Sequence, residues 1–148
     1  MTKNNDVLMA KKIRESLEII EESYEFLLTY GAQGRKHETD DKGPSKIRES
    51  LRLFENALEK IQDIDLSVFA KNISEFNKRF LEDLKVVRSI LKSLLELPVI
   101  TSDMIDNTND LIVIRPVMTS LFFIDQVFLP LELVVKIVFV GPYLQSNN

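Results

Sequence analysis

Two segments that begin with the same pentapeptide decide the fold class: IRESLEIIEESYE at residues 13–25 and IRESLRLFENALE at residues 47–59. Each belongs to a series of apolar residues that lie alternately four and three positions apart. This spacing puts the apolar side chains on one face of an α-helix and is typical of helices that pack side by side. The two series are Ile13, Leu17, Ile20, Tyr24 and Leu27, and Ile47, Leu51, Phe54, Leu58 and Ile61. Both segments are therefore predicted to be amphipathic helices.

The repeat has a period of 34 residues, and seven of the thirteen aligned positions are identical. Tetratricopeptide repeats have the same period, but here one helix and a loop fill it, and the Trp, Gly and Pro positions of that motif are missing. Two explanations stay open: convergence of similar amphipathic helices, or duplication of an ancestral helix. Neither assigns a function.

The rest of the chain completes the prediction of an all-α protein, a four-helix bundle of long antiparallel helices in a single domain over residues 1–148. A third apolar series runs from Phe69 to Leu94, and Pro98 disfavours a helical residue before it. Pro116 suits the first turn of a last, very hydrophobic helix, which Pro130 is expected to kink. The predicted helices cover about 6–31, 45–64, 66–97 and 116–140, with a charged loop at 34–45.

Two segments are open to other interpretations. LIVIR at 111–115 and VVKIVFV at 134–140 are rich in β-branched residues, which favour strands. Two strands alone are only marginally stable, and the chain offers no clear third, so the helical interpretation is preferred. The polar segment TSDMIDNTND at 101–110 is capable of a short helical turn.

The composition narrows the classes of function. The chain has 148 residues, a formal net charge of −4, no cysteine and one histidine. The absence of cysteine excludes disulfides, thiol nucleophiles and thiolate metal sites. Neither half of the chain has the excess of Lys and Arg that neutralises phosphates, so nucleic acid is not expected as a partner. The N-terminus lacks the apolar run of a signal peptide, which predicts a cytoplasmic protein.

No set of residues points to catalysis. His37 lies in the charged loop, in RKHETDD, whose spacing fits neither a calcium loop nor a zinc site. Glu21, Glu22 and Glu25 surround Tyr24 but lie off the apolar face, so we expect them in solvent. The sequence has no glycine-rich phosphate loop. We therefore expect no catalytic, cofactor-binding or metal-binding residue, no cofactor and no small-molecule substrate, and predict that the protein is not an enzyme.

The last predicted helix carries the residues of most interest. At about 100° per residue, Asp125, Glu132 and Lys136 project onto one narrow polar stripe, provided that the helix is straight. If Asp125 is paired, Arg115 or Lys136 is the predicted partner. The other sides of the helix are apolar, and such a wide apolar surface exceeds what one neighbouring helix covers. The predicted interface residues are Phe122, Phe123, Val127, Phe128, Val134, Val138 and Phe139.

Three environments could cover this helix: the other helices of the chain, another protein or a lipid bilayer. A bilayer is unfavourable, because each acid or Lys at the centre of a span costs roughly 2.5–3.5 kcal/mol. The sequence therefore predicts a non-enzymatic helical interaction module, a small assembly, adaptor or regulatory subunit. It would bind itself, as a homodimer, or another protein through the last helix. The alternative is a membrane-associated accessory protein anchored by that segment.

Overall fold

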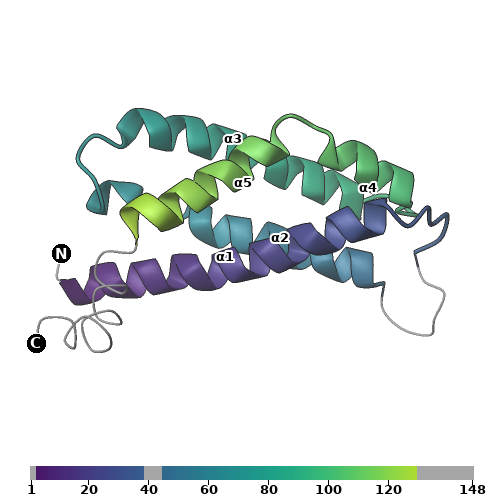
Figure 1. Cartoon of the computed structure of the whole chain (residues 1–148), viewed down its shortest axis with the longest axis horizontal. Helices are drawn as coiled ribbons and strands as arrows, with labels where there is room; N and C mark the ends of the chain where they lie inside the picture. Colours follow the sequence, from purple (N-terminus) through teal and green to yellow (C-terminus); the bar gives the residue numbers. More distant parts are fainter. Residues whose placement is uncertain (1–2, 39–44, 130–148) are drawn as a thin grey trace, which may run out of the picture.

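The computed structural model describes residues 3–38 and 45–129, and within these ranges the regular structure is helical throughout, with no strand (Figure 1). Five α-helices follow one another: α1 (Lys3–Gly31), α2 (Lys46–Gln62), α3 (Ser74–Leu95), α4 (Ser102–Asn109) and α5 (Ile114–Phe123). A 3₁₀ turn, η1 (Leu66–Val68), precedes α3, and a π-helical turn, η2 (Ile124–Phe128), continues α5. The prediction of an all-α protein is confirmed.

The longer helices alternate in direction along the chain. In Figure 1, α1 and α3 run from left to right, whereas α2 and α5 run from right to left. α1 packs against α2 and α4, α2 packs against α3, and α3 packs against α5. The short helix α4 lies at the end of the molecule where α1 finishes.

The two apolar series of the repeat lie in the core. Every member of the α2 series is fully buried, as is every member of the α1 series except Tyr24, which is half-buried. The two copies of IRESL are buried alike: Ile, Ser and Leu are buried, Arg is half-buried and Glu is exposed. The small side chains help α1 and α2 to approach closely, and the Ser50 hydroxyl lies 3.4 Å from the carbonyl oxygen of Ser23. Equal positions of the repeat thus have equal environments.

Several predicted boundaries are confirmed by local contacts. α1 ends at Gly31, and Gly34, three residues later, adopts the left-handed conformation with a φ of 65°. Ser45 is the N-cap of α2, where its hydroxyl accepts a hydrogen bond from the Arg48 amide. Of the predicted charged loop, the structure describes residues 34–38 and 45.

The predicted start of the third helix at residue 66 is wrong. Asp65 accepts a hydrogen bond from the Ser67 amide at 2.9 Å, which closes the 3₁₀ turn η1, and α3 begins only at Ser74. The physical reason is burial: Leu66 is 1% and Ile73 3% exposed. The irregular path lets both of these apolar side chains reach the core.

The last helix also differs from the prediction. It begins at Ile114, two residues before Pro116, and residues 111–115 form a turn and the first helical residues, so the strand interpretation of LIVIR is wrong. The segment 101–110 forms more than a turn, because Thr101 caps the full helix α4 through the Met104 amide. The predicted kink at Pro130 and the helical or strand interpretation of 130–140 lie outside the described residues.

Candidate interaction surface

α5 has a buried and an exposed side. Its inner side is fixed in the core by Ile114, Val117, Met118 and Leu121, and η2 adds Ile124. Exposed residues occupy the opposite side. We call this set the outer face of α5: Arg115, Thr119, Phe122, Phe123, Gln126 and Val127.

The centre of the outer face is apolar and open to solvent. Phe122 is 44%, Phe123 43% and Val127 47% exposed, whereas Leu121 and Ile124 beside them are fully buried. Single exposed apolar residues are common on soluble proteins. Here two adjacent phenylalanines and a valine are exposed together on the outer face, and large exposed apolar patches mark contact sites.

Phe123 belongs to an aromatic cluster formed by residues of α3, α5 and η2. Phe123 stands 5.3 Å from Phe76 of α3 and 5.2 Å from Phe128, measured between ring centroids, with the Phe128 ring edge-on at 89°. Phe76 in turn stacks on the buried Phe80 at 6.0 Å. Edge-to-face and offset aromatic pairs of this kind are favourable and hold the rings in place. Phe123 is therefore an anchored side chain with one side in solvent.

A π-helical turn follows Phe123 and includes Gln126 and Val127 of the outer face. The Leu129 amide bonds to the Ile124 carbonyl oxygen, five residues back, at 3.2 Å. This wider turn holds one more residue than an α-helical turn. The sequence offers a physical cause for the π-turn. In an α-helix that continued to residue 130, the ring of Pro130 would clash with the carbonyl group of Gln126. π-Turns within helices are rare overall, and those that occur are often found at functional sites.

The same turn alters the predicted polar stripe. The projection that aligned Asp125 with Glu132 and Lys136 assumed an uninterrupted α-helix, and that assumption is wrong at η2. Glu132, Lys136 and the predicted interface residues Val134, Val138 and Phe139 lie outside the described residues. Phe128 is half-buried within the aromatic cluster, so of the predicted interface residues Phe122, Phe123 and Val127 lie on the outer face.

Asp125 is paired across the molecule. Its Oδ1 accepts a hydrogen bond from Arg14 Nε of α1 at 3.1 Å, and each side chain is 28% exposed. The partner found is Arg14 and not the predicted Arg115, because α5 runs antiparallel to α1 and places Asp125 beside the first copy of IRESL. Lys136, the other predicted partner, lies outside the described residues. Asp125 thus faces the bundle, away from the outer face, and its charge is neutralised there.

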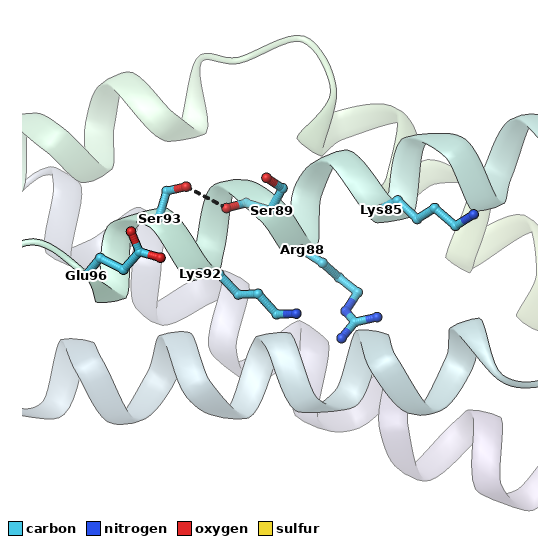
Figure 2. A pocket seen from close by; sticks show the side chains of 6 residues that line it. All are labelled: Lys85, Arg88, Ser89, Lys92, Ser93 and Glu96. Carbon is cyan, nitrogen blue, oxygen red and sulfur yellow. Dashed lines mark hydrogen bonds between the residues drawn. The ribbon is translucent and has the colours of Figure 1, made fainter.

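A polar groove lies on α3, and a second hollow is lined by Asp110, Leu111, Ile112, Arg115 and Pro116 where α5 begins. Figure 2 shows the residues that line the groove on α3, Lys85, Arg88, Ser89, Lys92, Ser93 and Glu96, all from one helix; its volume is about 410 Å³. Its central cation is already engaged: Arg88 bonds to Glu55 at 2.7 Å, to Glu59 at 2.7 Å and to Gln62 of α2. Lys92 lies 3.7 Å from Glu55. These ionic contacts join α2 to α3.

A second ion pair, between the half-buried side chains of Glu38 and Arg48, lies near the start of α2 and the end of α3. Both carboxylate oxygens of Glu38 bond to Arg48 of the second IRESL copy, at 2.7 and 2.9 Å, and accept further hydrogen bonds from the Ser45 hydroxyl and the Ile100 amide. The hydrogen bonds from Arg48 are the main cause that lowers the pKa of Glu38 below its ordinary value of 4.5. Arg48 also caps the end of α3 through the Leu95 and Leu97 carbonyl oxygens.

The two arginines of the repeat therefore have parallel roles, which the sequence prediction missed. Arg14 and Arg48 stand at the same position of IRESL, just outside the apolar series, and each reaches across to another segment. A half-buried Arg flanking an apolar face is the signal that would have identified them.

The residues considered in the sequence for acid–base chemistry or metal binding lie in solvent. No group of three or more His, Asp or Glu side chains in residues 3–38 and 45–129 could hold a metal ion. His37, Glu21, Glu22 and Glu25 are all exposed.

In residues 3–38 and 45–129, no single helix has the length and apolar character to cross a membrane. α4 together with Ile114–Phe128 meets both requirements as a pair bent by 59°.

Comparison of the chain with models of protein families, with curated proteins and with solved structures gave no match.

Proposed function

We propose that the protein is a four-helix bundle whose outer face on α5 binds another protein. The bundle helices are α1, α2, α3 and α5 with η2, and α4 connects α3 to α5. Support comes from the order of packing, in which α1 contacts α2, α2 contacts α3 and α3 contacts α5. The ion pair between Arg14 and Asp125 joins α5 to α1 and closes the ring.

The exposed aromatic centre of the outer face is the observation that carries the proposed binding function. A partner that buries Phe122, Phe123 and Val127 would remove their apolar surface from water. Each Å² so buried stabilises the complex by about 25 cal/mol. The side chains are also prepared for binding, because the ring cluster beneath Phe123 limits the freedom that a partner would have to restrict. A non-enzymatic role in assembly or regulation fits a surface of this kind.

Cysteine reactivity tests whether this face is covered. The chain has no cysteine, so Phe122→Cys and Val127→Cys each introduce one unique thiol. Leu53→Cys is the matched control, since Leu53 is 46% exposed and belongs to α2. The rate of alkylation is measured in purified protein and in an extract of the native host. We expect protection of the α5 thiols relative to the control in at least one of these; equal rates in both would contradict the proposal.

Membrane association is the second candidate function. The observation in its favour is the bent pair formed by α4 and Ile114–Phe128, which together have the length and hydropathy of a span. Flotation with liposomes decides between the two. Protein that floats with lipid, and loses this behaviour in a Phe122→Ser/Phe123→Ser variant, supports the membrane function; protein that stays in the dense fraction refutes it.

A further inference from the structure

We draw no further inference here: the strongest candidate, the exposed apolar patch of Phe122, Phe123 and Val127 on the outer face of α5, belongs to the surface already described, and nothing in the described residues shows what covers it.

Discussion

At the scale of single residues, the half-buried arginines decide how segments distant in sequence are joined. Arg14 and Asp125 are 111 residues apart, and each side chain keeps 28% exposure. Solvent therefore screens their attraction, and the pair should contribute modestly to stability. We expect Arg14→Gln and Asp125→Asn each to lower the free energy of unfolding by about 1 kcal/mol, and the double variant to lose less than the sum.

Urea denaturation of the two single variants and the double variant measures this coupling. Arg79→Gln is the control, because the Arg79–Asp83 pair at 3.4 Å lies within one helix and Arg79 is 78% exposed. It should change stability by only about 0.3–0.5 kcal/mol. Strict additivity of Arg14→Gln and Asp125→Asn would show that the two side chains do not interact in solution.

Glu38 should make stability depend on pH. Its side chain is 11% exposed and accepts hydrogen bonds from Arg48, Ser45 and Ile100. Because the folded state lowers its pKa below 4.5, the contribution of the carboxylate is fully present above that value and is lost as the pH falls through the lower folded-state pKa. At neutral pH, Glu38→Gln should lower the free energy of unfolding by about 2 kcal/mol.

The sign of the pH dependence provides the check. Denaturation midpoints of the wild type and of Glu38→Gln are compared from neutral pH into the acid range. The difference between the two proteins should shrink once the pH is below the ordinary carboxyl pKa. A difference that stays constant or grows on acidification would contradict this account of Glu38.

At the scale of elements, α2 and α3 are joined by a polar contact placed beside an apolar one. Arg88 of α3 is 14% exposed and Glu55 of α2 is 10% exposed. Removing only the cation would leave the buried carboxylate with Lys92 alone, at 3.7 Å. We expect Arg88→Met to lower the free energy of unfolding by about 2 kcal/mol.

A compensating change distinguishes a stranded charge from lost packing. Arg88→Met combined with Glu55→Leu removes both charges and should be more stable than Arg88→Met alone. Lys85→Met, at an exposed position of the same groove, should stay within about 0.5 kcal/mol of the wild type in thermal melts. A double variant no more stable than Arg88→Met would mean that the aliphatic stem of Arg88 matters more than its charge.

The elements also show what the sequence could and could not predict. Regular apolar spacing predicted α1, α2 and most of α3, because burial of one helix face dominates their stability. α4 was predicted only as a turn, since it is held largely by polar groups: Ser102 donates to the Tyr30 carbonyl oxygen at 2.6 Å and Asn109 to that of Leu27 at 3.3 Å. Such contacts leave no apolar period in the sequence.

The outer face of α5 could be predicted only in part, because apolar residues leave a pattern in the sequence and the path of the chain does not. Phe122, Phe123 and Val127 follow from the excess of apolar residues over what neighbouring helices can cover. The π-turn η2 and the pairing of Asp125 with Arg14 depend on the local path and on the antiparallel neighbour, and a straight-helix projection contains neither.

At the scale of the whole molecule, the described helices share one apolar core, while α5 keeps two phenylalanines in solvent. Of these, Phe123 contacts Phe76 of α3 and Phe128. Large apolar side chains are exposed elsewhere too, Ile112 at 86% among them, but Phe122 and Phe123 are the exposed phenylalanines of the described residues. The exposure is understandable if association covers the surface.

Sedimentation velocity of a fluorescently labelled chain tests that central claim most directly, with the protein measured alone over a range of concentrations and in an extract of the native host. The wild type should sediment faster than a single chain in at least one of these conditions. Phe122→Ser/Phe123→Ser should remain a folded monomer throughout, and the control Leu53→Ser, at a surface position that is 46% exposed on α2, should behave as the wild type. A wild type that sediments as a single chain in every condition, or a complex that the double substitution leaves intact, would contradict the account.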